Sequence, residues 1–168
     1  STRGAKYMID RGEIGEVYYG RSVMSFLRNR PYVDGYGTPA FVNKDTAGGG
    51  ALIDWGIYSI CQVLYLMGNP KPVRISGRTY NKIAMHEERA KESGYNVEEL
   101  GTGIVHFENG ATLDVFAAWA AYMNREKGSF VLGSKGGIQL PPLANGSVPD
   151  QAVMYHSSGD MELESVLG

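Results

Sequence analysis

The chain has 168 residues, of which 43% are hydrophobic and 20% charged, with a formal net charge of −2. This size suits one domain with a sizeable hydrophobic core, and the small negative charge, with no basic stripe, gives no electrostatic footprint for nucleic-acid binding. The single cysteine, Cys61, excludes an internal disulfide and favours a reducing compartment, so we expect a cytoplasmic protein.

The first part of the chain predicts a short helix, a strand and a long loop. Residues 5–11 have a helical pattern that ends at Gly12, whereas residues 16–27 are rich in Tyr, Val, Met and Phe, which is typical of a strand. Both faces of this strand are largely apolar, which is typical of a sheet covered on both sides. Residues 28–47 carry charges among Pro and Gly with no apolar period. Loops longer than about 12 to 15 residues are usually functional or disordered.

The central feature of the sequence is the segment of residues 48–70, GGGALIDWGIYSICQVLYLMGNP. Three glycines open it and Gly68-Asn69-Pro70 ends it, which predicts one buried helix. Asp54, Ser59 and Gln62 interrupt the apolar run, and the run is too short to span a bilayer comfortably. We therefore expect a core helix and no membrane partner.

The rest of the chain predicts mostly strands. Residues 73–80 read as a strand and residues 81–96 as a charged, mobile excursion. Asn109-Gly110 supplies the two residues with positive φ that a type I′ hairpin turn requires, and it joins predicted strands at residues 103–107 and 111–119. Further on we expect a second hairpin, a Pro/Gly/Asn loop and two short strands, at residues 129–140, 141–150, 152–156 and 161–165.

These elements predict an α+β fold: a predominantly antiparallel, open sheet with one long helix packed on one face. Consecutive strands joined by hairpins favour such a sheet, whereas a doubly wound parallel sheet requires strands that alternate with helices. We expect one domain over residues 1–168. Because the chain opens within what looks like the tail of a helix and stops in mid-pattern, we also expect it to be a piece of a longer protein.

Local motifs predict no cofactor or metal site within the chain. Residues 128–135 have the glycine spacing of a phosphate loop, but Ser134 stands where the lysine must be and the segment joins two strands. His86-Glu87-Glu88 lacks the second histidine of a zinc-protease helix. No G-x-G-x-x-G with a following acidic residue occurs, so the chain alone has no dinucleotide-binding fingerprint.

Asp54 and Tyr58 are the most suggestive pair of polar residues. They are four positions apart, so on a helix both fall on one face, about one turn from each other. In a structural interpretation, Asp54 interacts with the helix N-terminus and Tyr58 is an ordinary core aromatic. In a functional interpretation, both point into a cleft where residues 28–47 meet the helix. Tyr58 then donates or accepts a proton, and Asp54 holds a substrate hydroxyl.

The functional interpretation requires a cation. An unperturbed tyrosine titrates at about pH 10, so it acts as a base at neutral pH only beside a positive charge, and a neighbouring carboxylate opposes its ionisation. The cation must therefore come from Lys44 or Arg28 in the preceding loop, or from another domain.

The central segment resembles the signature helix of the glucose-fructose oxidoreductase and inositol dehydrogenase (Gfo/Idh/MocA) family. That signature runs Gly-Gly-Gly, apolar residues, Asp, x, Gly, x, His or Tyr, and then an apolar helix. Here Gly48-Gly49-Gly50, Asp54, Gly56 and Tyr58 occupy these positions. Many members have His where Tyr58 stands and Asp where Cys61 stands, so Tyr58 brings the chain nearer to the glucose-fructose oxidoreductase and dihydrodiol dehydrogenase branches. Further family motifs, in the same order, resemble residues 10–17, 107–111 and 133–138.

The resemblance implies the substrate-binding and oligomerisation domain of a two-domain enzyme. A preceding Rossmann domain would bind NAD or NADP and supply a catalytic lysine from a Glu-Lys-Pro segment, so the isolated chain is expected to be inactive and to bind no NAD. Asp54 and Tyr58 would be the catalytic residues of this half of the active site, which acts by hydride transfer on a sugar, cyclitol or dihydrodiol. Arg28, Lys44 and Asp45 are weaker candidates for substrate binding.

The resemblance also implies a homodimer or homotetramer that pairs through the open face of the sheet. Two alternatives stay open: a non-catalytic sugar-sensing protein that retains the fold, and an oligomerisation module whose helix is purely structural. An upstream Glu-Lys-Pro segment without its lysine would favour the first. Unchanged turnover of a Tyr58→Phe variant would favour the second.

Overall fold

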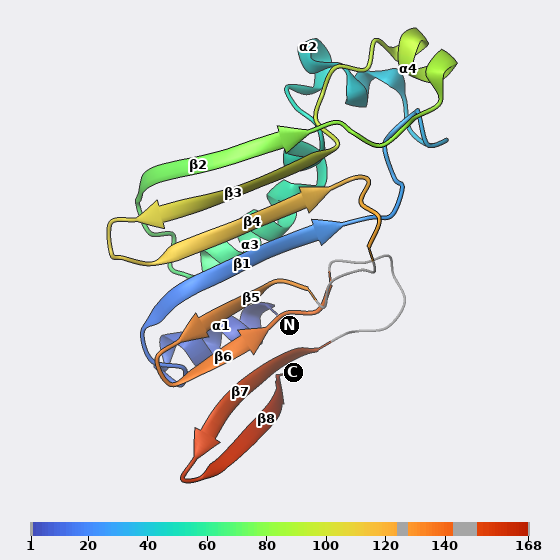
Figure 1. Cartoon of the computed structure of the whole chain (residues 1–168). Coiled ribbons are helices and arrows are strands. Elements are labelled where there is room, and N and C mark those ends of the chain that lie inside the picture. Colours follow the sequence, from blue (N-terminus) through green and yellow to red (C-terminus); the bar gives the residue numbers. More distant parts are fainter. Residues whose placement is uncertain (1, 124–127, 143–150, 168) are drawn as a thin grey trace.

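The computed structural model describes residues 2–123, 128–142 and 151–167, and Figure 1 shows one extended sheet with helices behind it and at one end. The helical elements are α1 (Thr2–Asp10), the 3₁₀ turn η1 (Pro39–Val42), α2 (Lys44–Ala47), the π-helical turn η2 (Leu52–Gly56), α3 (Ile57–Leu66) and α4 (Glu87–Ser93). The strands are β1 (Val17–Ser25), β2 (Pro72–Tyr80), β3 (Leu100–Phe107), β4 (Thr112–Ala118), β5 (Phe130–Gly133), β6 (Gly136–Gln139), β7 (Ala152–Ser158) and β8 (Met161–Leu167). Of the predicted loop at 141–150, residues 143–150 lie outside the described part.

The strands form one open sheet in the order β2-β3-β4-β1-β5-β6-β7-β8. Each neighbouring pair is antiparallel except β1 and β4, which run parallel; α3, β2 and β3 lie between these two strands in the chain. The predicted α+β fold with a predominantly antiparallel open sheet is confirmed.

The helices α1 and α3 pack on the same face of the sheet (Figure 1). The core between them and the strands contains Val63 and Leu66 of α3 and Leu113 of β4, each no more than 1% exposed. One polar pair lies in this layer: the Ser22 hydroxyl donates to the Ser59 hydroxyl over 2.8 Å, so neither group is left without a partner.

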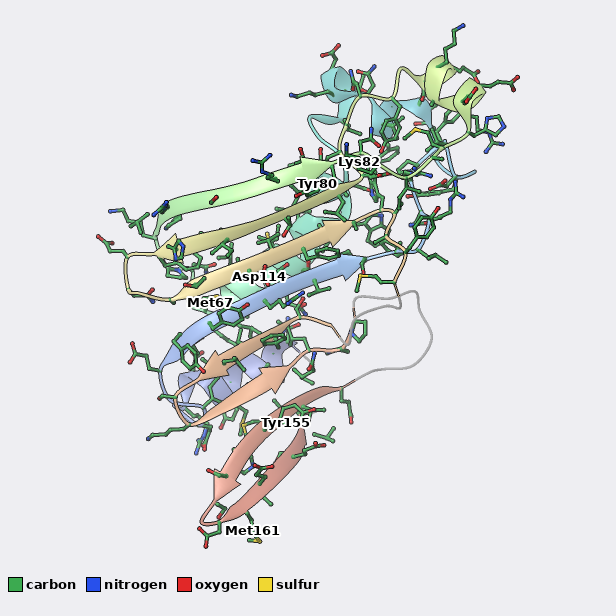
Figure 2. All side chains as sticks on the ribbon, in the orientation of Figure 1. Met67, Tyr80, Lys82, Asp114, Tyr155 and Met161 are labelled. Carbon is green, nitrogen blue, oxygen red and sulfur yellow. The ribbon has the colours of Figure 1, made fainter. Side chains whose placement is uncertain are left out.

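The opposite face of the sheet is covered by neither α1 nor α3, so the expectation of a sheet covered on both sides is wrong within this chain. The register puts Tyr19, Asp114 and Phe130 on this open face, where the Tyr19 and Phe130 ring centroids are 6.1 Å apart. Figure 2 labels Asp114 on β4 and Tyr155 on β7. A hollow of about 410 Å³ lies between Phe130 and Tyr155, over Gly137, which has no side chain to fill it.

The turn between β3 and β4 differs from the predicted type I′. Among the described non-glycine residues only Tyr32 and Asn69 have positive φ, so Asn109 lacks the left-handed conformation that type I′ needs, whereas Gly110 has φ +84°. The Gly110 N–H donates to the Phe107 carbonyl over 3.0 Å, and Asn109 Oδ1 accepts from the Ala111 N–H over 3.1 Å. This side-chain bond favours a three-residue loop with glycine at the left-handed position.

The two segments predicted to be irregular contain short helices, which gather at one end of the sheet (Figure 1). Residues 28–47 include η1 and α2, and the charged excursion predicted at residues 81–96 includes α4. At the start of α4 the His86 side chain accepts a hydrogen bond from the Arg89 N–H, and Gly94 ends the helix with φ +61°. The helix has seven residues and no apolar stripe, which is why periodicity did not reveal it.

The apolar segment of residues 48–70 is helical from residue 51 to residue 66, but it is not one uniform buried helix. It begins with the π-helical turn η2 and continues as α3. One face, which includes Ser59 and Val63, is buried against the sheet, whereas the other exposes Ile53 and Tyr58 to solvent. The prediction of a buried helix is therefore right for one face only. Among the described helices, none is both long and apolar enough to cross a bilayer.

Candidate functional site

A pocket of about 420 Å³ opens where η1 and α2 meet the start of the central helix. This is the junction of residues 28–47 with the helix, where the functional interpretation placed its cleft. Asp54 and Tyr58 both line it, so the structure brings the two predicted catalytic residues together. The other lining residues are Ala40, Phe41, Thr46, Ala47, Gly49, Ile53 and Ile57.

The start of the helix is held by Glu98, which lies just before β3. The Glu98 carboxylate accepts hydrogen bonds from the Gly50 N–H over 2.9 Å and from the Leu52 N–H over 3.1 Å, and the Glu98 carbonyl accepts from the Ala51 N–H over 3.1 Å. These bonds satisfy amide groups that a helix start leaves without partners. A side chain at Gly50 would overlap the Glu98 carbonyl oxygen, so the third glycine of the triplet is required by this close approach.

Asp54 stands within the π-helical turn η2 that follows this capped start. The N–H groups of Ile53 and Asp54 both donate to the Gly50 carbonyl, over 3.1 and 3.0 Å. A π-helical turn holds one more residue than an α-helical turn and is frequent at functional sites. Asp54 lies in the first turn of the helix, as the structural interpretation expects, but the carboxylate that accepts hydrogen bonds from the N–H groups of Gly50 and Leu52 is that of Glu98.

The Asp54 carboxylate is half-buried and hydrogen-bonded to one indole. Its Oδ2 accepts from Trp119 Nε1–H over 2.9 Å. Burial raises the pKa of the Asp54 carboxyl above its usual value, and the hydrogen bond from Trp119 opposes that rise. Trp119 is fully buried and follows the end of β4, and the sequence placed it only as the last residue of the predicted strand at 111–119.

Tyr58 is not the core aromatic of the structural interpretation. Its side chain is 61% exposed and points away from the sheet, at the edge of the pocket. Its ring lies 6.1 Å from that of Trp55, which in turn packs edge-on against Phe26 at 5.3 Å. Tyr58 is therefore an exposed side chain of the pocket that the half-buried Asp54 also lines.

A second tyrosine near Asp54, Tyr36, was not predicted as a site residue. Its hydroxyl donates to the Asn29 carbonyl over 2.6 Å. Burial, with the charge of Asp54 acting in the same direction, raises the pKa of Tyr36 to about 12, although a hydrogen bond with the Trp55 side chain opposes the rise. Tyr36 therefore stays protonated at neutral pH and is a neutral neighbour of Asp54.

The three weaker candidates lie elsewhere. Lys44 lines a neighbouring hollow of about 550 Å³, which shares Gly49 and Ile53 with the Asp54–Tyr58 pocket. Asp45 is exposed on α2 and lines neither hollow. Arg28 donates from Nη2 to the Ala84 carbonyl over 3.0 Å, outside the pocket. Among the described residues that line the Asp54–Tyr58 pocket there is thus no Lys, Arg or His.

The strongest charge cluster of the described structure was missed by the sequence interpretation, which chose Arg28 instead of Arg30. We call Arg30, Asp34 and Glu99 the Arg30 cluster. Arg30 is fully buried, and it donates to Asp34 through Nε over 2.9 Å and Nη2 over 3.0 Å, and to Glu99 through Nη1 over 2.9 Å. It also donates to the carbonyls of Ile83 and Ala84, which ties the two irregular segments together. All five N–H groups of this guanidinium are satisfied, so the cluster has a structural role.

Metal ligands do not gather in the described part of the chain, where no group of three His, Cys, Asp or Glu side chains could hold a metal ion. The pocket therefore offers a carboxylate, a phenol and an apolar wall.

Comparison with known proteins matches residues 2–139 to the GFO/IDH/MocA C-terminal domain family. D-glucoside 3-dehydrogenase of Escherichia coli K12 is 28% identical over 148 residues, which cover 84% of this chain and 41% of that protein. The chain thus spans less than half the length of this curated relative.

Solved structures share the fold. Aldose-aldose oxidoreductase from Caulobacter crescentus, crystallised with glycerol, matches 98% of this chain and 43% of its own with a TM-score of 0.68 and 23% identity. An inositol dehydrogenase homolog from Azotobacter vinelandii, crystallised with NAD+, matches 98% of this chain and 40% of its own with a TM-score of 0.73 and 18% identity.

Proposed function

Because this chain belongs to the GFO/IDH/MocA C-terminal domain family, we propose that it is the substrate-binding domain of an NAD(P)-dependent oxidoreductase. The reaction is hydride transfer between a nicotinamide cofactor and a sugar, cyclitol or dihydrodiol. The names of its relatives, a glucoside dehydrogenase, an aldose oxidoreductase and an inositol dehydrogenase homolog, support this class of substrate.

One observation carries the proposal: the Asp54–Tyr58 pocket offers an acid and a phenol, but no basic side chain lines it among the described residues. A tyrosine that takes a proton at neutral pH needs a nearby cation, and Lys44 and Arg28 are both directed elsewhere. The missing cation is what a lysine from a preceding Rossmann domain would supply. The matched relatives are more than twice as long as this chain, which leaves room for such a domain.

The residues of the pocket suit the oxidation of an alcohol. A nicotinamide cofactor, when bound, would supply the hydride acceptor for the carbon that carries the hydroxyl. Tyr58 Oη, ionised beside the cation that the preceding domain would supply, takes the proton of that hydroxyl, so a C–H and an O–H bond break as the carbonyl forms. The Asp54 carboxylate accepts a hydrogen bond from a hydroxyl of the substrate and fixes its orientation. In the reverse direction Tyr58 returns the proton to the carbonyl oxygen.

The cofactor is proposed to bind mainly outside this chain. The exposed face of the helix, with Ile53, Ile57 and Tyr58, is apolar and surrounds the mouth of the pocket. A nucleotide-binding domain that docks here would exclude water from the reacting atoms. On this proposal the isolated chain is inactive, and its exposed free Cys61 accords with a reducing, cytoplasmic location.

Lys44, Arg28 and Asp45 are proposed as peripheral contacts to substrate. Lys44 is the best placed of the three, because its hollow adjoins the pocket through Gly49 and Ile53. A substrate larger than one sugar ring would extend from one hollow into the other. Arg28 and Asp45 line neither hollow and would reach only the outer part of such a substrate.

We further propose a homodimer or homotetramer paired through the open face of the sheet. That face presents the hollow between Phe130 and Tyr155, and in its centre Arg21 Nη1 lies 3.4 Å from Asp114 Oδ2. A second sheet could fill the hollow and desolvate this ion pair. Light scattering of the full-length protein should give at least a dimer, and a monomer would contradict this part of the proposal.

The experiment that tests the function is turnover of full-length Tyr58→Phe, followed by NAD(P)H absorbance on a panel of sugars and polyols. Loss of the proton relay should lower kcat by about 100-fold or more, because general acid–base catalysis contributes at least that factor. Tyr7→Phe is a matched control, since Tyr7 is 60% exposed, against 61% for Tyr58, but lies on α1. Wild-type turnover in Tyr58→Phe would contradict the proposed mechanism.

A further inference from the structure

Trp119 fixes the Asp54 carboxylate from the side opposite to solvent. The indole N–H donates to Asp54 Oδ2 over 2.9 Å, and no hydrogen bond between described residues uses Oδ1. One oxygen is therefore held by the protein, and the other is left for a ligand in the pocket that Asp54 lines.

Trp119 is itself held rigidly. Its side chain is fully buried, in a small apolar cluster with Val42 and Val97. Its backbone N–H donates to the Glu99 carbonyl over 2.8 Å, and its own carbonyl accepts from the Asn29 N–H over 2.8 Å. The indole therefore has a fixed place relative to both irregular segments.

The Arg30 cluster lies directly behind this anchor. Asn29 and Glu99, the two backbone partners of Trp119, are respectively the neighbour of Arg30 in sequence and a member of the cluster. The charges that tie the two segments together thus also set the position of the indole. This is a continuous set of contacts from a structural cluster to the Asp54 carboxylate.

Trp119 is the largest fully buried side chain among the described residues, so its indole also has a packing role. Phe or Leu would fill only part of its volume and could not donate a hydrogen bond. The indole N–H satisfies a half-buried carboxylate and favours its charged, accepting form, against the desolvation that Asp54 experiences.

We propose that Trp119 is a positioning residue of the reaction: its indole N–H orients the Asp54 carboxylate so that Oδ1 faces the substrate hydroxyl. The proposal rests on the proposed function for its catalytic consequence. The hydrogen-bond coupling of Trp119 to Asp54 can be measured without turnover.

The pH dependence of this coupling is set by few groups. Among the described residues, the titratable side chains next to Asp54 are Tyr36, from residues 28–47, and Tyr58, from α3, and the Tyr36 hydroxyl stays protonated through neutral pH. α2 presents Thr46 and Ala47 to the pocket, and neither titrates. Glu98 is bonded to the helix start and Glu99 to Arg30.

The first test is nuclear magnetic resonance of the full-length protein labelled with ¹⁵N-tryptophan. The indole ¹H–¹⁵N resonance of Trp119, assigned by its loss in Trp119→Phe, should shift as Asp54 titrates and should become independent of pH in Asp54→Asn. The same resonance should persist in Trp55→Phe. A Trp119 resonance that changes neither with pH nor in Asp54→Asn would overturn the proposal. If Trp119→Phe does not fold, the loss of the resonance in Trp119→Tyr provides the assignment.

The second test is the kinetics of Trp119→Phe. Loss of one hydrogen bond to a charged group should lower kcat about 10-fold or more, with the KM of the cofactor unchanged. The acidic limb of the pH–rate profile should move upward by about one pH unit, because the carboxylate has lost its donor. Wild-type kcat with an unmoved profile would overturn the positioning role. If the Trp119 indole resonance shifts as Asp54 titrates but Asp54→Asn keeps full turnover, the proposed function fails, whereas the coupling between Trp119 and Asp54 is still supported.

Discussion

The Arg30 cluster and the Asp54–Tyr58 pocket contain the same kinds of side chain in opposite situations. In the cluster, Asp34 accepts two bonds from one guanidinium, and its side chain is only 8% exposed. In the pocket, Asp54 is half-buried and has one neutral donor, Trp119. Tyr58 beside it is mostly exposed.

The difference appears in the pKa of the two carboxyl groups. Burial alone would raise the pKa of Asp34, but the hydrogen bonds and charge of Arg30 outweigh burial and lower it. Burial raises the pKa of Asp54, and Trp119 only partly opposes that change. A carboxylate whose partners are complete stabilises the fold, whereas one whose partners are incomplete is available to a ligand.

The largest change in the free energy of unfolding is expected from Arg30→Met. This change removes the cation of the buried Glu99 and leaves Asp34 only the more distant Arg28, at 3.7 Å, so the free energy of unfolding should fall by about 3–5 kcal/mol. Chemical denaturation measures it. Lys71→Met is the control, because Lys71 is paired with Glu108 at 3.7 Å on the surface, and its loss should cost less than about 1 kcal/mol. Equal losses in the two variants would remove the distinction between the cluster and a surface ion pair.

A smaller loss of stability than in Arg30→Met is expected when acid protonates Asp34. The folded-state pKa of Asp34 lies below its unfolded value, so its contribution is present above an unfolded pKa of about 3.9 and is lost as pH falls towards the folded value. The stability difference between wild type and Asp34→Asn should therefore shrink between pH 6 and pH 2.5, by at most about 2 kcal/mol. Denaturation curves at several pH values measure this difference, and one that does not change with pH would show that Asp34 is not held by Arg30.

The contribution of Asp54 to stability should change with pH in the opposite direction to that of Asp34. Its folded-state pKa is raised, so protonation favours the folded state, and any stability from the neutral form is lost as pH rises through the folded pKa. The ionised carboxylate at neutral pH is a cost to the fold that a purely structural residue would not impose.

Much of the fold follows from local pattern. The alternation in residues 111–119 and the hairpin signals predict β3 and β4, and the glycine triplet predicts the helix start. The predicted type I′ turn at Asn109-Gly110 was wrong. The Asn109 side chain accepts a hydrogen bond from the Ala111 N–H, and this bond competes with the type I′ conformation. The place of β1 between β4 and β5 could not be predicted, because the pairing joins residues 93 to 116 positions apart in sequence.

Much less of the candidate site was predictable. Asp54 and Tyr58 stand out because polar residues interrupt an apolar helix, and they do line one pocket. Trp119, Tyr36 and Glu98 approach them from distant parts of the chain, and no spacing rule links them to residue 54. Arg30 could not be distinguished from Arg28 by type, because only the folded chain shows that Arg30 is buried and Arg28 is not.

The most direct test of the comparison measures unfolding free energy and turnover on the same samples of full-length Asp34→Asn and Asp54→Asn. We predict a crossed result. Asp34→Asn should lose about 2–3 kcal/mol of stability and keep most of its turnover per folded molecule. Asp54→Asn should stay within about 1 kcal/mol of wild type, or become more stable, and lose at least about 10-fold in kcat. An Asp54→Asn variant that turns over normally but is as destabilised as Asp34→Asn would contradict the account.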